Sequence, residues 1–536
     1  MGILVVKETI DSQVKDRDLL YQTYLKALCV HFNRVHGESH DCVYWESLVG
    51  PWLWHLICYL QYRYVLVDNG YVLREDYTHL AQETGYAPYD YVSFLYLFER
   101  TDYVAELDNL LWGKAKDIRD KKWVCRQFLP ITLSMWKRVL FKLLSRVSRL
   151  WMKAAPVLMV SPWLSWKQLC RVVWISRGRI RPVFLMDSDS SGEINDDFRC
   201  WSSTSFMQCL PKNLQFTWLL NQVPWVYLEG YQALKKRVPI MPEKCQLLFS
   251  AVGWNQDEVF KLMAADAAEN GVLRVGMQHG GGPYGSGCGL NVLQEMKSVD
   301  HFLTWGWSDR DLSCSPVGSA RLQQLVQRVK YSPQPEKGGV LYLGTTVSKS
   351  YPSGFGSPSG YEFKAYLAWQ HLFLTSLSTQ AASQLTVRLY PDNGHYGWNQ
   401  AEGVRALKPD LLIDSTTPYA KALSNAQLVV CDNHYSTWME VCACDIPGVW
   451  FFDPHLWPIH PRAYKIFEDM KRVGIWHDSP ISAAKQIDRI IDDPYAWWHS
   501  TDVRPVIQRF SETFAYVPMD FPRQLTQKLL RLAQLE

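Results

Sequence analysis

Short apolar runs alternate with segments of helical periodicity between about residue 240 and residue 452, and this alternation limits the possible folds more than any other feature. We predict strands at 246–252, 272–277, 301–305, 339–343, 385–390, 426–431 and 448–452. We predict helices between them at 255–270, 361–377, 418–423 and 437–444. Strands that alternate with helices of this length are typical of parallel sheets built from βαβ units. The pattern therefore predicts an α/β protein with two Rossmann-like domains that face each other across a cleft.

The same pattern predicts four regions along the chain. They are a helical N-terminal region at 1–154, the two Rossmann-like domains at 155–315 and 316–500, and a helical tail at 501–536. The aromatic-rich segment 44–66 is predicted to be a buried helix in the first region. Its Gly50-Pro51 pair is expected to break that helix or to start a new one.

The composition limits the partners and the location of the protein. Hydrophobic residues make up 47% of the chain and charged residues 20%, as in ordinary soluble proteins. The net charge of +3 gives no electrostatic reason to expect nucleic acid as a partner. The 13 cysteines include no CxxC pair, so we expect reduced thiols in a cytoplasmic protein and no metal site. The sequence has no uninterrupted apolar run of about 18 residues, the length that a membrane-spanning helix needs.

A basic stretch at 121–153 holds nine Lys or Arg residues and no Asp or Glu. At helical spacing, one face of this stretch carries Trp136, Leu140, Leu143, Leu144, Val147, Leu150 and Trp151. The opposite face carries Arg138, Lys142, Arg146 and Arg149. Such a helix can lie in an anionic membrane interface, which would make the protein peripheral on the inner face of the cytoplasmic membrane. The alternative is a helix that packs on the body of the protein and exposes only its basic face.

A glycine-rich loop follows the predicted strand at 272–277 and has six glycines among residues 279–289. Glycine lets a backbone approach a ligand closely because it has no Cβ atom. His279 lies at the exit of the strand, where it can contact whatever the loop binds, and its proton moves readily near neutral pH. We expect Gln278, Gly280, Gly281 and Tyr284 to form the rest of this acceptor loop. The alternative is a turn whose histidine only bonds the backbone.

Three strand exits in the second Rossmann-like domain carry groups that suit a phosphate. Gly344, Thr345 and Thr346 offer backbone N–H groups and hydroxyls, and Arg388 offers a planar cation. The third exit, which runs into a helix, holds Asp432, Asn433, His434, Ser436 and Thr437, with Glu440 one turn later as a partner for a ribose or sugar hydroxyl. In open α/β sheets, ligands bind beyond such strand ends. The alternative makes Ser436 and Thr437 simple helix caps and Arg388 part of a surface ion pair.

Four motifs carry a family resemblance: YWESLVGPWL, QHGGGPYG, DHFLTWGW and SNAQLVVCDNHYSTWMEVCACDIPGV. Together they resemble the LIC12162-type transferase family of the kind found in Leptospira O-antigen clusters. The resemblance extends from about Lys15 to about Pro494. The strand followed by HG, the RLYP strand and the D-N-x-x-S-T exit are more distantly similar to CDP-glycerol glycerophosphotransferases and capsule-type Kdo transferases. The exit reads D-N-H-Y-S-T here and D-Y-S-S in the glycerophosphate enzymes, which leaves the donor open.

The resemblance implies a GT-B fold with a helical N-terminal region, a nucleotide donor bound mainly by the C-terminal domain, and no essential metal or other cofactor. It implies that His279 acts on the acceptor hydroxyl, and that Arg388, Ser436 and Thr437 surround the donor phosphates. The expected activity is sugar transfer from a nucleotide sugar to an O-antigen or capsule type polysaccharide acceptor. If the reaction retains configuration, Asp257 or Glu258 becomes the more important side chain. The alternatives are a CDP-polyol phosphotransferase of cell-surface polymer synthesis, and a non-catalytic scaffold of a glycan-assembly complex.

Overall fold

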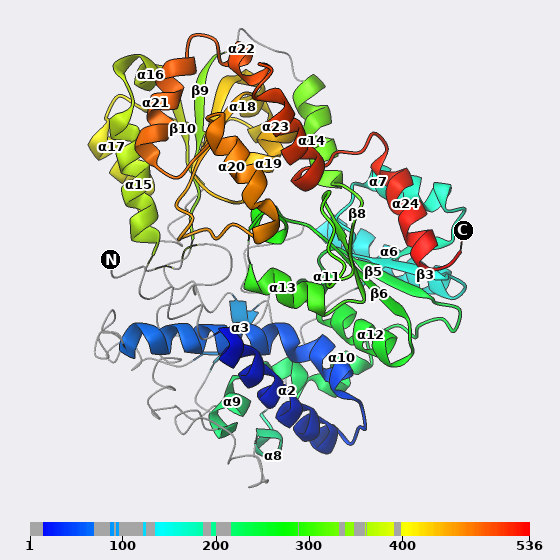
Figure 1. Ribbon diagram of the computed structural model, residues 1–536. Coiled ribbons are helices and arrows are strands. Elements are labelled where there is room, and N and C mark those ends of the chain that lie inside the picture. Colours follow the sequence, from blue (N-terminus) through cyan, green and yellow to red (C-terminus); the bar gives the residue numbers. More distant parts are fainter. Residues whose placement is uncertain are drawn as a thin grey trace. The chain divides into compact units, whose positions relative to one another are not determined.

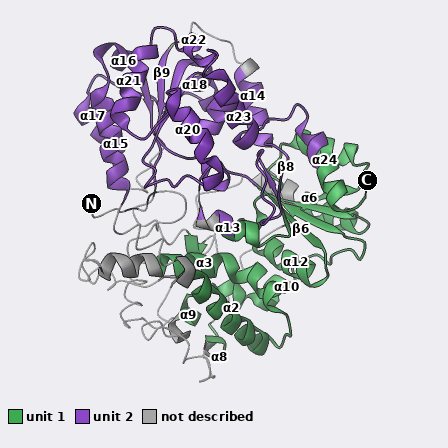
Figure 2. Ribbon diagram, in the orientation of Figure 1, with its two compact units in different colours: residues 1–277, 294–301, 526–536 green, residues 278–293, 302–525 purple. Residues whose placement is uncertain are grey.

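The structure is a computed structural model, and it describes residues 14–68, 86–90, 93–95, 122–124, 135–185, 194–199, 216–287, 289–331, 338–347, 358, 360, 362–390 and 398–535. The chain divides into two compact units, coloured green and purple in Figure 2. Unit 1 consists of Met1–Met277, Gln294–His301 and Thr526–Glu536, and unit 2 consists of Gln278–Leu293 and Phe302–Leu525. The glycine-rich loop therefore belongs to the same unit as the three strand exits.

One parallel sheet of six strands has the order β4-β3-β5-β6-β7-β8. The strands are β3 (Val157–Val160), β4 (Ile180–Val183), β5 (Leu247–Ser250), β6 (Leu273–Met277), β7 (His301–Thr304) and β8 (Cys314–Pro316). Every residue of β3 and β5 is buried, as expected for parallel strands that are covered on both faces. The sequence predicted β5, β6 and β7, but it did not distinguish β3 and β4 within residues 155–245.

The second parallel sheet also has six strands, in the order β11-β10-β9-β12-β13-β14. They are β9 (Gly338–Leu343), β10 (Leu385–Arg388), β11 (Leu412–Ile413), β12 (Ala426–Cys431), β13 (Gly448–Phe451) and β14 (Trp476–His477). Numbered along the chain, this order is 3-2-1-4-5-6, the order of the Rossmann fold. Two parallel sheets with intervening helices confirm the predicted α/β class. The two-residue strands β11 and β14 were not predicted.

Helices cover both faces of the second sheet, as Figure 1 shows. One group is α15 (Phe363–Ser376), α16 (Thr379–Ser383), α17 (Gln400–Leu407) and α21 (Pro480–Ile490). The other is α14 (Ala320–Tyr331), α18 (Tyr419–Asn425), α19 (Ser436–Ala443), α20 (Tyr464–Arg472) and α23 (Arg504–Phe514). Phe373 and Leu374 of α15 and Ile487 of α21 pack with the buried strand residues in one hydrophobic core. This core fixes the strand ends that carry the candidate site.

Further elements complete the description. In unit 1 they are β1 (Tyr86–Pro88), β2 (Lys122–Val124), α6 (Met135–Met152), α7 (Trp166–Ile175), α8 (Asp196–Arg199), α9 (Phe216–Gln222), α10 (Tyr231–Lys235), α11 (Gly253–Gln256) and α12 (Glu258–Glu269). The remaining helices are η5 (Trp225–Tyr227), η6 (Gly282–Tyr284), α13 (Leu290–Lys297), η7 (Pro461–Ala463), α22 (Pro494–Trp498) and α24 (Phe521–Leu532). Much of the predicted helical region falls at 69–134, which lies largely outside the described residues.

The N-terminal helices correct one prediction. Helix α2 (Val14–His36) packs on α3 (Cys42–Asp68), and α3 continues through Pro51 without the expected break. Proline in a helix interior removes one backbone hydrogen bond and disfavours the helix. Tertiary burial compensates here, because Trp45 and Trp52 of α3 are completely buried. Although α3 is long and apolar, none of the helices in the described parts of the chain has the length and apolar character to cross a membrane.

Candidate functional site

The candidate site lies at the carboxyl ends of three neighbouring strands in unit 2. Leu343 at the end of β9 is in register with Arg388 of β10 on one side and with Cys431 of β12 on the other. The residues that follow these strands therefore emerge in one row. The strand order reverses between β9 and β12, and ligands of open α/β sheets bind at this switch point. The structure thus brings together the three strand exits that the sequence singled out.

Arg388 lies half-buried at the end of β10. Its Nη1 donates a hydrogen bond to the Thr417 carbonyl oxygen at 2.7 Å, and its guanidinium carbon lies 5.8 Å from the ring centroid of Tyr419. No carboxylate of the described residues forms an ion pair with it, which differs from the surface ion pair considered as the alternative. The hydrogen bond and the ring fix a planar cation at the row of strand ends, where it can pair with an anionic group.

The exit of β9 provides less than the sequence predicted. The Gly344 N–H donates to the Arg388 carbonyl oxygen at 3.0 Å, and the Thr345 N–H donates to the Tyr366 hydroxyl at 3.0 Å. These two N–H groups hold the loop in place, so the expectation that they bind a phosphate is wrong. Thr346 differs, because its hydroxyl oxygen is buried without a hydrogen-bond partner among the described residues. A buried polar atom without a partner calls for an explanation, such as a ligand or an ordered water.

Asp432 and Asn433 are buried and form hydrogen bonds inside the turn after β12. The Asp432 carboxylate accepts hydrogen bonds from the hydroxyls of Tyr342 and Tyr366, the latter at 2.7 Å, and from the Asn433 side chain at 3.0 Å. Burial raises the pKa of Asp432 to about 6. Trp450 donates to the Asn433 carbonyl oxygen at 2.6 Å. Both residues are buried inside the turn, so their expected contact with donor phosphates is wrong.

His434 is also internal. Its Nε2 lies 2.9 Å from the hydroxyl of Ser286, and its ring stacks on Phe452 at a centroid distance of 4.8 Å. Burial lowers the pKa of His434 to about 3, so the ring is neutral at physiological pH. A neutral imidazole offers a phosphate no charge, and the Nε2 of this ring is already paired with Ser286. This differs from the expected phosphate contact, and in the structure His434 connects the turn after β12 to the glycine-rich loop.

The glycine-rich loop packs directly on this turn. A Cβ atom on Gly281 would lie 2.5 Å from the Ser436 nitrogen, and one on Gly282 would lie 2.6 Å from the His434 ring. Real Cβ atoms essentially never approach other heavy atoms this closely. Glycine is required at both positions because two backbones meet there. The predicted acceptor loop and the predicted phosphate turn therefore form one substructure of unit 2.

Ser436 and Thr437 are the first residues of α19, and both are half-buried. The N-cap position is occupied by Tyr435, whose side chain forms no capping hydrogen bond, so Ser436 and Thr437 are not the N-cap residues that the alternative made them. The first N–H groups of a helix have no partner within the helix, and they form a favourable site for an anion. The two hydroxyls lie beside these groups, on the same row as Arg388.

Glu440 is buried and contacts two neighbouring helices. Its carboxylate forms an ion pair with Arg321 of α14 at 2.7 Å, and its side chain is only 4% exposed. The carboxylate also interacts with the hydroxyl of Tyr419. These contacts join α19 to α14 and α18. In the structure Glu440 thus holds helices together, which differs from the expected role as a partner for a ribose or sugar hydroxyl.

Gln278 and His279 at the start of the loop have different surroundings. Gln278 is buried, and its side-chain oxygen accepts hydrogen bonds from the Trp305 backbone at 2.9 Å and the Trp307 indole at 3.0 Å. Its amide donates to the Gly280 carbonyl oxygen at 2.8 Å. His279 is half-buried, and its Nε2 lies 2.6 Å from the Tyr284 hydroxyl. Gln278 therefore positions the loop, while His279 retains partial access to solvent.

The two carboxylates considered for a retaining mechanism have structural partners. Asp257 caps α12 by accepting a hydrogen bond from the Phe260 N–H at 3.0 Å. Glu258 forms a completely buried ion pair with Lys261 at 2.7 Å, and Lys261 also donates to the Tyr227 hydroxyl at 2.6 Å. Both carboxylates belong to unit 1. These contacts give both acidic residues a structural role at the start of α12.

One group beside the loop was missed by the sequence. The Arg462 guanidinium lies 4.4 Å from the ring centroid of Trp307 and forms an ion pair with Asp309 at 2.6 Å. Next to it, the His460 N–H donates to the Ser286 carbonyl oxygen at 2.9 Å. The partners lie far apart in the chain, so no local pattern could have associated them. The His460 contact ties the second half of the glycine-rich loop to the segment around η7, and the Arg462 contacts tie the same segment to Trp307 and Asp309.

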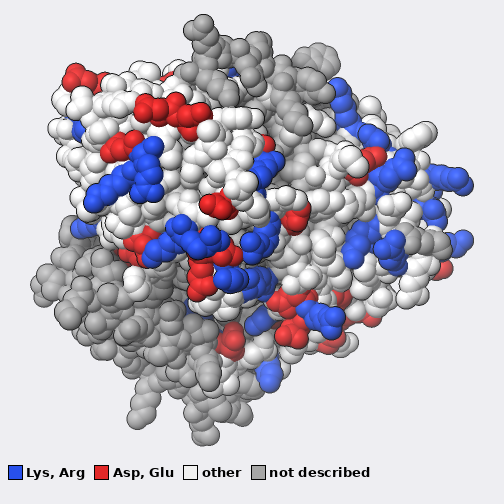
Figure 3. All heavy atoms as spheres, turned by 45° about the horizontal axis from the view of Figure 1, so that its top comes forward, with Lys and Arg blue, Asp and Glu red and all other residues white. Residues whose placement is uncertain are grey.

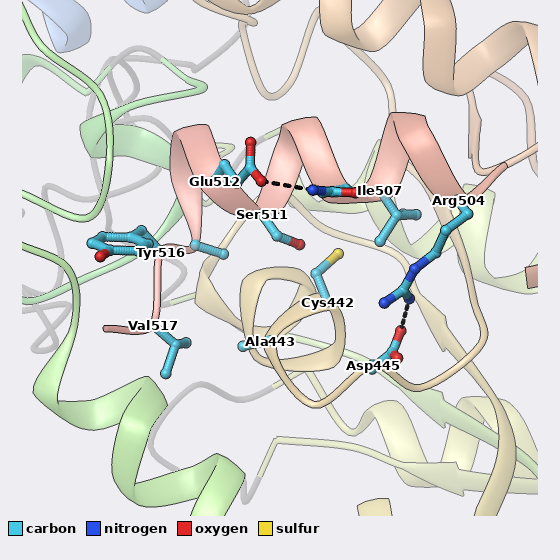
Figure 4. A pocket seen from close by; sticks show the side chains of 11 residues that line it. Cys442, Ala443, Asp445, Arg504, Ile507, Ser511, Glu512, Tyr516 and Val517 are labelled. Carbon is cyan, nitrogen blue, oxygen red and sulfur yellow. Dashed lines mark hydrogen bonds and ion pairs between the residues drawn. The ribbon is translucent and has the colours of Figure 1, made fainter. Parts of the chain in front are cut away.

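A cavity of about 320 Å³ lies elsewhere in unit 2, between α19 and α23. Figure 4 shows Cys442 and Ala443 at the carboxyl end of α19 facing α23, with the Arg504–Asp445 ion pair at one side. Ser436 and Thr437 lie at the opposite end of α19, so this cavity is separate from the row of strand ends. Throughout the described residues, no three His, Cys, Asp or Glu side chains are grouped as a metal site would need.

Comparison with known proteins gives a family match and distant structural similarities. The family model described as LIC12162 family transferase matches residues 4–530. A variant of the wall teichoic acid polymerase TagF is 11% identical, with a TM-score of 0.35 over 74% of this chain and 93% of its own. MurG from Acinetobacter baumannii is 12% identical, with a TM-score of 0.33 over 71% and 99%. The N-terminal domain of Candida albicans trehalose-6-phosphate phosphatase is 11% identical, with a TM-score of 0.37 over 71% and 100%. These structural similarities carry no functional argument, and no curated protein matches the chain.

Proposed function

Because the chain belongs to the LIC12162 family of transferases, we propose that it is a metal-independent glycosyltransferase of GT-B type. It transfers a sugar from a nucleotide sugar to a surface polysaccharide acceptor of O-antigen or capsule type. One observation supports the donor site most strongly: Arg388 and the N-terminus of α19 stand on the ends of strands in register, around the switch point of a Rossmann-type sheet. A nucleotide diphosphate has the charge and the size that this arrangement favours.

In the proposed reaction the donor diphosphate lies between Arg388 and the first turn of α19. The hydroxyls of Ser436 and Thr437 and the N–H groups of that turn donate hydrogen bonds to it, with the Thr346 hydroxyl as a further donor. When the bond between the sugar and the diphosphate breaks, negative charge increases on the departing nucleotide. Fixed donors and a fixed cation stabilise that charge without having to reorganise. This stabilisation is the main catalytic contribution that we assign to the site.

His279 is proposed to act on the acceptor. As the acceptor hydroxyl oxygen attacks the anomeric carbon, the imidazole takes its proton and the carbon–diphosphate bond breaks. The 2.6 Å contact with the Tyr284 hydroxyl holds the ring in one orientation, and partial exposure lets the acceptor reach it. A positioned histidine suits this role because its ordinary pKa lies near neutrality. Asp257 and Glu258 are not needed for this inverting reaction.

The second candidate is a CDP-polyol phosphotransferase, because the same cation and helix N-terminus would also hold the diphosphate of a CDP donor. The product separates the two activities. We expect the purified protein, given nucleotide sugars and a glycan acceptor, to release a nucleotide and to form a glycosidic bond without adding phosphorus. Mass spectrometry and phosphorus NMR of the product test this expectation. Phosphorus in the product would favour the phosphotransferase. The protein would instead be a non-catalytic scaffold if it turned over neither donor class and if His279→Ala and Arg388→Ala left the assembly of the glycan-synthesis complex unchanged.

A further inference from the structure

Helix α6 exposes apolar side chains that a helix packed on the body of the protein would bury. Of its described apolar residues, Leu143, Val147 and Leu150 are 58%, 52% and 71% exposed and Trp151 beside them is also exposed, while Leu144 is half-buried. The buried face consists of Ser145, Ser148 and Met152 instead. The Ser148 hydroxyl accepts a hydrogen bond from the Phe184 N–H at 3.1 Å, which fixes this orientation against the end of β4. Over residues 143–152, the apolar face is therefore largely exposed, which differs from the alternative of a helix that buries this face on the body.

Helix α7 extends the exposed apolar surface. Trp166 and Trp174 of α7 are 58% and 79% exposed. Trp166 stacks on Phe184 at a centroid distance of 5.6 Å, and Phe184 is the residue whose N–H bonds Ser148 of α6. Arg181 of β4 bonds the Trp151 carbonyl oxygen and lies over the Trp151 ring. Both helices therefore pack beside β4 in unit 1, and we call their exposed side chains together the α6–α7 surface.

The charge of this region has one sign. Residues 121–186 include fourteen Lys or Arg and no Asp or Glu. Among them Arg146 and Lys153 of the α6 segment and Lys167 of α7 are exposed, and none of the three forms an ion pair with a described residue. In Figure 3, Lys and Arg gather on the right, the side on which Figure 1 labels α7 and α24, with few Asp or Glu among them. The α6–α7 surface thus combines exposed Leu, Val and Trp with positive charge.

This combination decides between possible occupants. A second copy of the chain docked through the same surface would place positive charge against positive charge, which is unfavourable. An anionic lipid surface satisfies both properties, because Trp and Leu insert at the level of the head groups while Lys and Arg reach the phosphates. Each basic residue near such a surface contributes attraction that falls with salt.

We propose that the α6–α7 surface binds anionic lipid bilayers and holds the protein on the membrane. This proposal does not depend on the transferase activity, since it concerns residues outside the row of strand ends. If the acceptor of the proposed reaction is attached to lipid, membrane binding also brings the enzyme to it.

The test is co-sedimentation of the full chain with vesicles, without donor or acceptor. We expect binding to vesicles of phosphatidylcholine that contain phosphatidylglycerol, and little binding to phosphatidylcholine alone. The double variant Arg146→Gln/Lys153→Gln should bind about thirtyfold more weakly, because each basic residue contributes about 1 kcal/mol at such a surface. The double variant Leu150→Gln/Trp151→Gln should bind at least about tenfold more weakly, because apolar area can no longer be buried. Leu412→Gln is the matched control, since Leu412 is similarly exposed (61%) but belongs to β11 of unit 2.

Circular dichroism of each variant shows that it is folded. Equal binding to both kinds of vesicle, or full binding by the folded Leu150→Gln/Trp151→Gln variant, would overturn the proposal. A dimer in sedimentation velocity that this variant dissociates, together with no vesicle binding by the natural sequence, would assign the surface to a second copy instead. Each result is independent of nucleotide binding, so a failure here leaves the proposed function untouched.

Discussion

Replacing Gly281 with alanine is expected to lower the free energy of unfolding by about 1–3 kcal/mol, the usual cost of forcing extra atoms into a packed region, and to remove most of the transferase activity. The new Cβ would lie 2.5 Å from the Ser436 nitrogen and closer still to the Ser436 Cα. Backbone atoms cannot rotate away as a side chain does, so either the loop or the N-terminus of α19 must move. Movement of α19 displaces Ser436 and Thr437 from the row that includes Arg388.

The matched control is Gly280→Ala in the same loop. Its Cβ would first meet the Tyr284 ring, at 3.1 Å, and a ring can shift by a few tenths of an ångström. Thermal unfolding and steady-state kinetics of both variants measure the contrast. If Gly281→Ala kept the stability and the activity of the natural sequence while Gly280→Ala lost them, the close packing of Gly281 on Ser436 would be contradicted.

Replacing Glu258 with alanine is expected to lower the free energy of unfolding by about 3–5 kcal/mol, the cost of leaving the partner of a buried ion pair without its counter-charge. Lys261 and Glu258 are both almost completely inaccessible to solvent, so water cannot replace the lost carboxylate. The Tyr227 hydroxyl remains near the Lys261 ammonium, but it carries no charge. Denaturant unfolding measures the loss.

Two comparisons show whether Glu258 is structural or catalytic. Lys465→Ala removes an exposed ammonium that pairs with Glu468 at 4.0 Å and with Asp469 at 3.7 Å, and it should change the stability by less than about 1 kcal/mol. The fraction of Glu258→Ala that remains folded should bind nucleotide normally, because Glu258 does not belong to the unit that carries the donor site. An unchanged stability combined with a large loss of kcat would instead identify Glu258 as the carboxylate of a retaining mechanism.

The positions of the strand exits could be predicted from the sequence for a clear physical reason. Strands β9, β10, β12 and β13 are largely buried, so their sequences are short apolar runs with abrupt ends. Parallel connection then requires those ends to share one edge of the sheet. Arg388 and the Ser436–Thr437 turn could therefore be placed together without knowledge of the structure. The two-residue strands β11 and β14 are too short to produce such a pattern.

The roles of single polar residues could not be predicted, because their partners lie far away in the chain. Asp432 is bonded by Tyr342, 90 positions earlier, and His434 by Ser286, 148 positions earlier. A strand exit with Asp, Asn and His has the same sequence whether these side chains face a ligand or hold the turn. The orientation of α6 was open for a similar reason. Its periodicity shows that one face is apolar, but only the contact between Ser148 and Phe184 shows that this face is exposed.

The measurement that tests the donor site most directly is thermal unfolding of the purified protein with CMP, CDP, UDP, GDP or dTDP at millimolar concentration. A ligand that binds only the folded state stabilises it by mass action, by about 2.7 kcal/mol at a hundredfold excess over Kd. We expect one of these nucleotides to raise the Tm by several degrees, and Arg388→Ala to remove this increase. Arg405 is an exposed arginine on α17, and the control variant Arg405→Ala should retain the increase. No increase with any nucleotide, or the same increase in Arg388→Ala as in the natural sequence, would contradict a donor site at the ends of β9, β10 and β12.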